Sequence, residues 1–247
     1  MTHRLALIGH PVSHSLSADY FMHKFAQEGI DGSYYLLDMV TLDNLKSQIL
    51  SHNLTGFNVT SPHKQAVIPF LDYLTEEGKA IGAINTVAIY QGKLIGHNTD
   101  AIGFAEAILP LLKPHHTSAL IFGNGGAAKA VAYALSNILH IDYRCVARRD
   151  CDLDFSDVDK QLLTNPSILI NCTTLGMTSN SEPLPIPYQY ITKDHLLFDL
   201  VYAPQVTPFL ALGQQQGATI CNGLSMLYAQ AEAAWKFWNS SFEPFFR

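Results

Sequence analysis

The sequence predicts an α/β fold, and three observations lead to that class. Short runs of β-branched and aromatic residues alternate with helical patterns through the first hundred residues. The same alternation resumes after a break at residues 113–116, K-P-H-H. The length of 247 residues fits one or two domains at roughly 150 residues each. Such an alternation is typical of βαβ units around a largely parallel sheet.

The first hundred residues predict the following elements. The apolar run at residues 5–8 predicts a strand that ends at Gly9, and Ser17 can act as the N-cap of a helix that ends at Gly29. Gln91-Gly92 predicts a hairpin turn. Further strands are expected at 34–37, 57–59 and 85–90, and further helices at 42–50 and 76–80.

The rest of the chain predicts a second set of strands and helices. Five aspartates between residues 150 and 159 indicate a solvated loop and the start of a helix. The last helix, residues 225–238, is apolar over a broad face and must pack against something. The other elements are strands at 119–122, 143–146, 168–170, 196–199 and 218–220, and helices at 99–112, 127–139 and 208–216.

Composition excludes two classes of partner. Lys and Arg total 15 against 21 Asp and Glu, which gives a net charge of −6, and no long basic stretch is present. A nucleic-acid partner is therefore not expected. No apolar run reaches the ~18 residues of a membrane span, and the chain begins without a secretory apolar segment. We expect a soluble protein of the cytoplasm.

The cysteines and histidines predict neither a disulfide framework nor a metal site. Cys145, Cys151, Cys172 and Cys221 form no C-x-x-C pair, a pattern that fits reduced thiols. The 11 histidines are scattered, and none has metal-ligand spacing with a cysteine. No metal is expected.

A glycine-rich turn predicts a dinucleotide site. The run G-N-G-G-A-A at residues 123–128 lies between an expected buried strand and a long helix. Glycines let the backbone approach a pyrophosphate, and the free N–H groups at the helix N-terminus stabilise its charge. An ordinary tight turn between strand and helix is the alternative interpretation.

The end of the next strand bears on the choice of cofactor. An acid there binds a free ribose hydroxyl, whereas a cation accommodates a 2′-phosphate. Arg148 and Arg149 stand at this point and favour NADP over NAD. Asp150 follows directly and weakens the signal, and Arg149 could instead pair with a nearby aspartate.

Four polar runs in the first hundred residues are candidates for a substrate site. They are residues 9–17, with two histidines and three serines; 58–64, which ends in Lys64; 82–86, which ends in Asn85-Thr86; and 98–100, which ends in Asp100. Each has a simpler structural interpretation when taken alone. Lys64 could be a solvated lysine, Asp100 a first-turn helix acid, Ser17 an N-cap and Asn85 part of a turn.

Taken together, these runs resemble the shikimate dehydrogenase family. The sequence has H-S-L-S at 14–17, N-V-T-S-P-H-K at 58–64, G-A-I-N-T at 82–86 and N-T-D-A-I-G at 98–103. The glycine turn resembles the family's G-x-G-G-A, and N-C-T-T-L-G-M at 171–177 its N-x-T-x-x-G-M. Residues 199–208 and 223–231 continue the resemblance nearly to the C-terminus.

The resemblance implies two domains and a reaction. Residues 1–100 and 222–247 would form the substrate domain, to which the C-terminal helix returns, and residues 101–221 a Rossmann-like NADP-binding domain. The reaction would be reversible hydride transfer between NADP and the C3 position of shikimate, in the pathway to aromatic amino acids. Lys64 would be the acid/base and Asp100 its charged neighbour.

The resemblance also implies binding residues. Ser15 and Ser17, aided by Tyr202, would bind the substrate carboxylate, and Thr60, Asn85, Asp100 and Gln230 the rest of the substrate. The residues implied for the cofactor are Glu76, Gly123, Asn124, Gly125, Gly126, Ala127, Arg148, Arg149, Thr173, Leu200 and Gly223. Two residues depart from the family pattern: His63 stands where an aromatic residue is usual, and Ala147 where asparagine is common.

Other functions stay open at this point. One is an NAD-using quinate/shikimate dehydrogenase, and another is a ligand-sensing module of the same fold, which would be expected to lose Lys64 or Asp100. A folate-type dehydrogenase would need a lysine motif that the sequence lacks. The sequence fits either a monomer or a homodimer.

Overall fold

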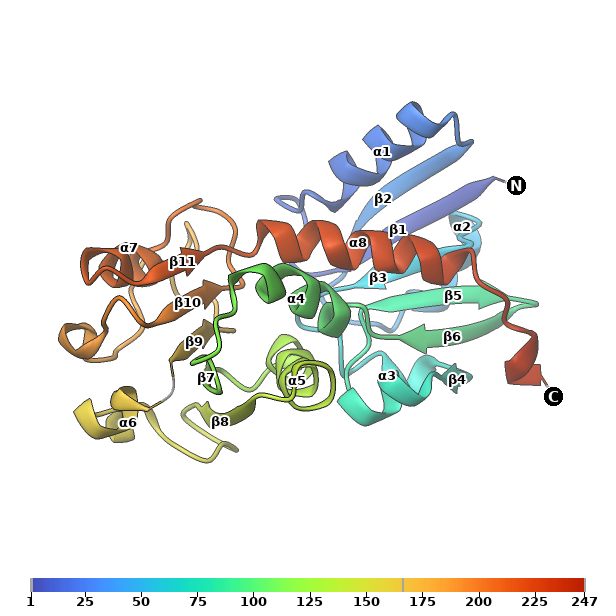
Figure 1. Ribbon diagram of the computed structural model, residues 1–247. Helices are drawn as coiled ribbons and strands as arrows, with labels where there is room; N and C mark the ends of the chain where they lie inside the picture. The colour runs from blue at the N-terminus through green and yellow to red at the C-terminus, as the bar shows by residue number, and fades with distance from the viewer. Residues whose placement is uncertain (1, 166, 247) are drawn as a thin grey trace. The chain divides into compact units, whose positions relative to one another are not determined.

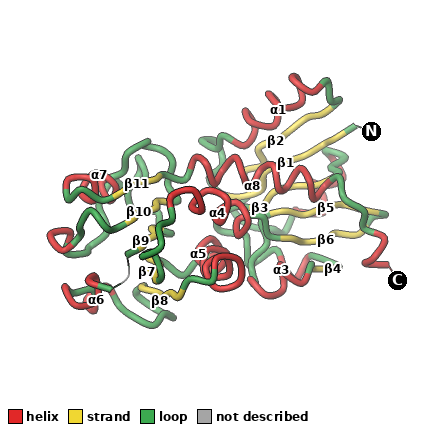
Figure 2. The backbone as a smooth tube through the Cα atoms, viewed as in Figure 1, coloured by secondary structure: helices red, strands yellow, loops and turns green. Residues whose placement is uncertain are grey.

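The computed structural model describes residues 2–165 and 167–246, and the chain divides into two compact units. The first unit contains the residues up to Thr99 and those from Gln230 onward, and the second unit contains Asp100–Ala229. Figure 1 labels the helices and strands of both units, and Figure 2 colours the same backbone by secondary structure. The two units are described separately below.

The first unit is built on a mixed sheet in the order β2-β1-β3-β5-β6-β4. Its strands are β1 (His3–Gly9), β2 (Gly32–Asp38), β3 (Gly56–Val59), β4 (Tyr73–Leu74), β5 (Thr86–Tyr90) and β6 (Lys93–His97). β1 pairs in parallel with β2 and β3, whereas β5 is antiparallel to both β3 and β6. The expected parallel arrangement therefore covers only part of this sheet. The reason is the predicted hairpin, in which Gln91 and Gly92 both have positive φ.

The helices of the first unit are α1 (Ser17–Glu28), α2 (Leu45–Ser51) and α3 (Glu76–Ile81). The prediction that Ser17 is the N-cap of α1 is wrong. Leu16 occupies that position and makes no side-chain cap bond, while Ser17 is the first helical residue. The serine hydroxyl is directed instead to other polar groups, described below. Gly29 ends α1 in the left-handed conformation, as expected.

Helix α8 (Leu224–Trp238) carries the chain from the second unit into the first. The part of α8 from Gln230 onward packs on the first unit, where Ala231, Trp235 and Trp238 join the core around Phe21. The Trp238 indole Nε1 also donates a hydrogen bond of 3.0 Å to the Val87 carbonyl oxygen in β5. The apolar face predicted for this helix is thus covered by the first unit, to which it was expected to return.

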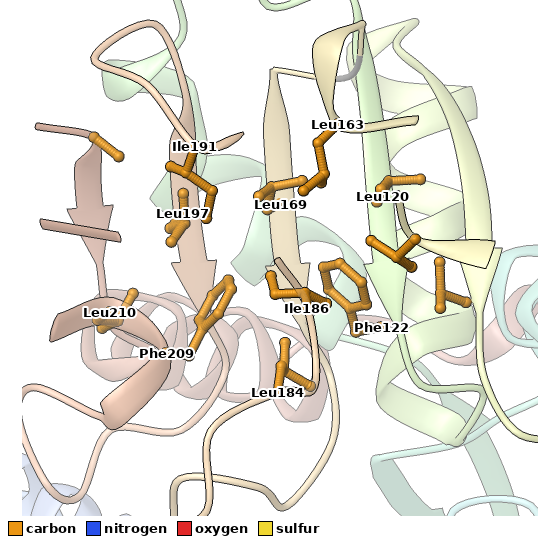
Figure 3. Close-up of a cluster of buried hydrophobic side chains, with 13 residues drawn as sticks. Leu120, Phe122, Leu163, Leu169, Leu184, Ile186, Ile191, Leu197, Phe209 and Leu210 are labelled. Atoms are coloured by element: carbon orange, nitrogen blue, oxygen red, sulfur yellow. The ribbon is translucent and has the colours of Figure 1, made fainter. Parts of the chain in front are cut away.

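The second unit has a parallel five-stranded sheet in the order β11-β10-β9-β7-β8 within the described residues. The strands are β7 (Ser118–Phe122), β8 (Asp142–Val146), β9 (Ile168–Asn171), β10 (Leu196–Asp199) and β11 (Thr219–Cys221). The helices are α4 (Asp100–Ile108), α5 (Gly126–Tyr133), which continues as a π-helical segment over Ala134–Leu139, α6 (Lys160–Thr164) and α7 (Pro208–Gln215). Figure 3 shows Leu120, Phe122, Leu169, Leu197 and Phe209 in the buried cluster on this sheet.

The prediction that the thiols are reduced is wrong for one pair. Cys145 at the end of β8 and Cys151 form a disulfide, with a Cα–Cα distance of 5.2 Å. The chain folds back beyond β8, where Leu153 N donates to Cys145 O and Ala147 N donates to Leu153 O, each at 3.0 Å. This return brings together two cysteines that are six positions apart. Cys172 and Cys221 are free thiols.

Candidate active site

Two serine hydroxyls lie together beyond β1. Ser15 Oγ donates to Ser17 Oγ at 3.2 Å, and the backbone N–H of Ser17 donates to Ser15 Oγ at the same distance. Ser15 is half-buried and Ser17 is buried. Adjacent hydroxyls at the start of a helix are suited to hold a carboxylate, because both can donate to it and the helix N-terminus favours negative charge.

Lys64 lies in a tight turn after β3. His63 N donates to Thr60 O at 2.9 Å, and Ile84 N donates to Lys64 O at 2.7 Å, so the turn is tied both to itself and to the next segment. Lys64 and Thr60 are half-buried. The Lys64 side chain therefore starts from a fixed backbone at the carboxyl edge of the sheet.

His63 fills a buried position in the same turn. It is 4% exposed, and its Nε2 lies 2.6 Å from the Met39 carbonyl oxygen. A carbonyl only accepts, so Nε2 carries the hydrogen. His63 thus joins the Lys64 turn to the segment after β2.

A buried polar network fixes Asn85, Thr99 and Gln230. Asn85 Nδ2 donates to Thr99 Oγ1 at 2.9 Å, and Thr99 N donates to Asn85 Oδ1 at 2.7 Å. Gln230 Oε1 lies 3.4 Å from Asn85 Nδ2 and 3.5 Å from Thr99 Oγ1. Two of the predicted substrate residues, Asn85 and Gln230, are therefore neighbours although 145 positions separate them.

Asp100 is the first residue of α4 and is buried. Its backbone follows directly on Thr99, which the network above holds. Lys64 belongs to the first unit and Asp100 to the second, so their pairing stays a prediction.

The glycine turn of the second unit fits a pyrophosphate. Gly123 has φ of 109°, and a Cβ there would lie 3.2 Å from the Cys172 carbonyl, so only glycine suits the position. Gly125 precedes α5 with no side-chain cap bond, and a Cβ there would meet nothing within 4 Å. The backbone N–H groups in the first turn of α5 have no partner within the helix, and no side chain fills the space beside Gly125. This cradle is the feature that a dinucleotide needs.

The segment after β8 places Arg148 and Arg149 beside that turn. Both arginines are exposed, and Asn124 Nδ2 donates to the Arg149 carbonyl oxygen at 2.8 Å. Neither guanidinium makes a hydrogen bond or ion pair with any residue that the structure describes, so Arg149 is not paired with an aspartate. Both cations are available to a phosphate.

Leu200 and Gly223 lie against each other. Leu200 N donates to Asn171 O at 3.0 Å, and Gly223 N donates to Val201 O at 3.3 Å. A Cβ on Gly223 would overlap the Leu200 carbonyl oxygen, which explains the glycine. Tyr202 follows in the same segment and is half-buried.

Sequence reasoning missed Asp199, which ties the loops beyond β9 and β10. Its carboxylate accepts from Thr207 Oγ1 at 2.5 Å, from Val201 N at 3.0 Å and from Asn171 Nδ2 at 3.0 Å. Asn171 Oδ1 in turn accepts from Thr173 N and from Thr173 Oγ1, so this predicted cofactor residue belongs to the same network. Burial raises the pKa of Asp199 to about 6, although the three hydrogen bonds act the other way. The sequence signal that could have identified Asp199 is an acidic residue at the end of a predicted buried strand.

Glu76 is an exposed residue that pairs with a lysine on its own helix. It lies in the first turn of α3, its side chain is 90% exposed, and it pairs with Lys79 at 2.6 Å. The other predicted cofactor residues belong to the second unit, whereas Glu76 belongs to the first. Its predicted role gains no support from its contacts.

The described residues offer neither a metal site nor a membrane-spanning helix. No group of three or more His, Cys, Asp or Glu side chains in the described ranges could hold a metal ion. Within those ranges, every helix is too short or too polar to cross a membrane.

Comparisons with known proteins agree along nearly the whole chain. The family model described as the shikimate dehydrogenase substrate binding domain matches residues 7–87. A protein of Staphylococcus aureus named shikimate dehydrogenase (NADP(+)) is 36% identical over 252 residues, which cover 96% of this chain and 92% of that protein.

Solved structures give the same result. The shikimate 5-dehydrogenase of Thermus thermophilus, in complex with NADP(H) and shikimate, is 32% identical with a TM-score of 0.84, over 96% of this chain and 94% of that one. The quinate dehydrogenase of Corynebacterium glutamicum, in complex with NAD, is 27% identical with a TM-score of 0.84 and the same coverage. By its 36% identity to a relative that it matches over nearly the whole of both chains, the chain belongs to the shikimate dehydrogenase family.

Proposed function

We propose that this chain catalyses the reversible reduction of 3-dehydroshikimate to shikimate with NADP. The observation that carries the proposal is the pair of built sites. The first unit holds the serine pair, Ser15 and Ser17, and a buried polar network that contains Asn85 and Gln230, and an open glycine cradle precedes α5 in the second unit. One suits a polar ring with a carboxylate, and the other suits a dinucleotide.

The substrate would be held by directional hydrogen bonds. Ser15 and Ser17 donate to the carboxylate, and Tyr202 adds its hydroxyl. Thr60, Asn85 and Gln230 orient the ring hydroxyls, because neutral polar groups discriminate hydroxyl positions without attracting other charges. These contacts fix which carbon of the ring is presented for reaction.

Lys64 would move the proton. In reduction, its ammonium donates a proton to the C3 carbonyl oxygen as that oxygen becomes a hydroxyl, and in oxidation the neutral amine takes the proton back. Asp100 would be the charged neighbour of Lys64 at the substrate hydroxyl. The presence of both residues argues against a non-catalytic sensing module.

The cofactor would bind the second unit. The backbone of Gly123–Ala127 would hold the pyrophosphate together with Asn124, and Arg148 the 2′-phosphate with Arg149 beside it. Thr173, Leu200 and Gly223 would border the nicotinamide. When bound, NADPH would supply a hydride to C3 in the reduction, and NADP+ would accept it in the oxidation.

A second candidate is an NAD-using enzyme that also accepts quinate. Ala147 in place of the family's usual asparagine removes a side chain that could bind the ribose. The solved structure of the quinate dehydrogenase with NAD is similar to 96% of this chain. Neither observation removes the two unpaired arginines, which favour a phosphate.

Initial rates decide between the two candidates. Absorbance at 340 nm is followed with shikimate or quinate and with NADP or NAD. We expect the highest kcat/KM for shikimate with NADP.

Arg148→Ala should raise the KM for NADP about 10-fold or more, since it removes a charge-assisted contact, and should leave the KM for NAD nearly unchanged. Arg144→Ala, an exposed arginine on β8, is the matched control. Faster turnover with NAD and quinate would contradict the proposal.

A further inference from the structure

The disulfide between Cys145 and Cys151 encloses the two arginines of the second unit, and the proposed function gives it no role. Cys145 lies in β8, and Cys151 follows Arg148 and Arg149, so the bond closes a loop whose tip carries both exposed cations. Both cysteines are half-buried. The bond is therefore within reach of a small thiol from solvent.

The disulfide loop is joined to the glycine turn at three points. Cys145 Sγ lies 3.5 Å from the Gly123 carbonyl oxygen, and Gly123 N donates to Val146 O at 2.9 Å. Asn124 Nδ2 donates to Arg149 O at 2.8 Å. A change in the loop would therefore change where the arginines stand relative to the candidate pyrophosphate cradle.

The tip of the loop, residues 148–151, has few restraints besides the disulfide. Backbone hydrogen bonds between β8 and the returning segment hold only the base of the loop. In the described ranges, the one hydrogen bond that the tip makes is the bond from Asn124 to Arg149 O. Asp150 has φ of 53°, a left-handed conformation that is uncommon for a residue other than glycine. The covalent bond is thus the main restraint on the conformation of the tip.

We propose that the Cys145–Cys151 pair is a redox site that sets the affinity for NADP. The disulfide holds the segment of Arg148 and Arg149 in one arrangement, so less conformational entropy is lost when the 2′-phosphate binds. When the bond is open, the tip can adopt other conformations, and binding must order them. NAD has no 2′-phosphate, so its affinity should not depend on the loop. This role rests on the proposed function, in which the arginines bind that phosphate.

Opening the bond takes two electrons and two protons, which a dithiol supplies. One thiolate of the dithiol attacks one cysteine sulfur and forms a mixed disulfide, while the other cysteine leaves as a thiolate and takes up a proton. The second sulfur of the dithiol then attacks the first, which closes the reagent's own disulfide and releases the remaining cysteine as a thiol. Cys145 and Cys151 are reduced, and the dithiol is oxidised.

Peptide mapping tests whether the bond forms in solution. Trypsin cuts after Arg148 and Arg149, between the two cysteines, so only a disulfide keeps the two peptides joined. After incubation of the protein with glutathione disulfide, we expect Cys145 joined to Cys151, and dithiothreitol should separate the peptides. Glutathione on either cysteine in place of this bond, or two unjoined thiols, would overturn the proposal.

Calorimetric titration with NADP and with NAD tests the effect of the bond. Reduction with dithiothreitol should raise the Kd for NADP about 10-fold, the effect of ordering a loop that was ordered before. The Kd for NAD should stay within about twofold. Cys151→Ser keeps the loop open and should bind NADP as the reduced protein does, with or without dithiothreitol. Cys221→Ser removes a free thiol outside the loop and is the matched control.

The outcomes distinguish the redox role from the proposed function. An equal Kd for NADP in both redox states would overturn the redox role, and so would an equal rise for NAD, which indicates a general effect on the fold. If Arg148→Ala weakens NADP binding while reduction does not, only the redox role fails. If Arg148→Ala leaves NADP binding unchanged, the phosphate assignment fails, and the redox role fails with it.

Discussion

The buried polar side chains of the first unit bond mainly to one another. Asn58, Asn85, Thr86 and Thr99 form a continuous set of hydrogen bonds, and each is at most 6% exposed. Polar groups withdrawn from water keep their positions only when their hydrogen bonds are made, because an unmade bond in a buried site is costly. The network therefore gives the candidate substrate site a fixed shape.

Residue identities were easier to predict than residue partners. The motifs pointed to Ser15, Lys64 and Asn85, because short polar runs after strands are visible in a sequence. The bonds of Tyr34 and Asp199 were not predictable, since each joins groups that meet only once the sheets have formed. A tyrosine within an apolar strand gives no sign that its hydroxyl reaches an asparagine on another strand.

His97 makes the stability of the first unit depend on pH. It is enclosed by Thr75 Oγ1 at 2.9 Å from Nδ1, by the ring of Phe237 and by Glu77 at 3.9 Å. Burial lowers its pKa from 6.5 to about 4. As the pH falls below 6.5 the unfolded chain takes up a proton that the folded chain refuses, so stability declines until the folded group titrates near pH 4.

Replacing His97 should remove this dependence. We expect the wild-type free energy of unfolding to lose about 2 kcal/mol more than that of His97→Gln between pH 7 and pH 5. Urea unfolding at the two pH values measures the difference. His23→Gln, an exposed histidine on α1, serves as the control and should behave as the wild type. Equal losses in His97→Gln and the wild type would contradict the account.

At the scale of elements, periodicity predicted most helices and strands but not how their ends are made. The hairpin at Gln91-Gly92 and the apolar face of α8 were predicted and are present. The two-residue strand β4 was not predicted, because so short a segment has no periodicity to detect. Ser17 is not the N-cap because Leu16 occupies that position, and the Ser17 hydroxyl instead accepts from Ser15 Oγ.

The packing of α8 on β3 and β5 depends on Gly56. A Cβ on Gly56 would lie 2.6 Å from Trp238 Nε1 and 3.0 Å from the Val87 carbonyl oxygen, the pair joined by the indole hydrogen bond. Gly56→Ala should therefore lower the free energy of unfolding by about 1–3 kcal/mol, the usual cost of overpacking a core.

Urea unfolding of Gly56→Ala and of the double variant with Trp238→Phe checks the cause. The phenylalanine ring leaves more room, so Gly56→Ala should cost less in that background. An equal cost in both backgrounds would show that the indole is not what excludes the side chain.

At the scale of the whole molecule, the chain crosses between its units twice. The contacts divide it between Thr99 and Asp100 and again between Ala229 and Gln230. The predicted boundaries fell after residue 100 and after residue 221, so the second crossing lies within α8 rather than before it. Residues within a continuous helix give no composition shift, and a boundary there cannot be read from the sequence.

The buried acid Asp199 should respond to a fall in pH in the opposite direction from His97. In the second unit, burial raises the pKa of Asp199 to about 6, above the 3.8 of an unperturbed aspartate. The folded carboxyl therefore binds a proton before the unfolded one does, and its contribution to stability rises as the pH falls from 6 toward 4. The wild-type free energy of unfolding should therefore gain about 1 kcal/mol relative to that of Asp199→Asn between pH 7 and pH 5. An equal pH dependence in the wild type and in Asp199→Asn would contradict this assignment.

The assignment of Lys64 as the acid/base is the central claim, because a proton donor distinguishes an enzyme from a binding module. The most direct test is the turnover of Lys64→Ala with saturating shikimate and NADP, together with the Kd for shikimate. Loss of a proton donor should lower kcat by about 10²- to 10⁴-fold and change the Kd only a few-fold. A variant that keeps wild-type turnover, or that loses only affinity, would contradict the assignment of Lys64 as the acid/base.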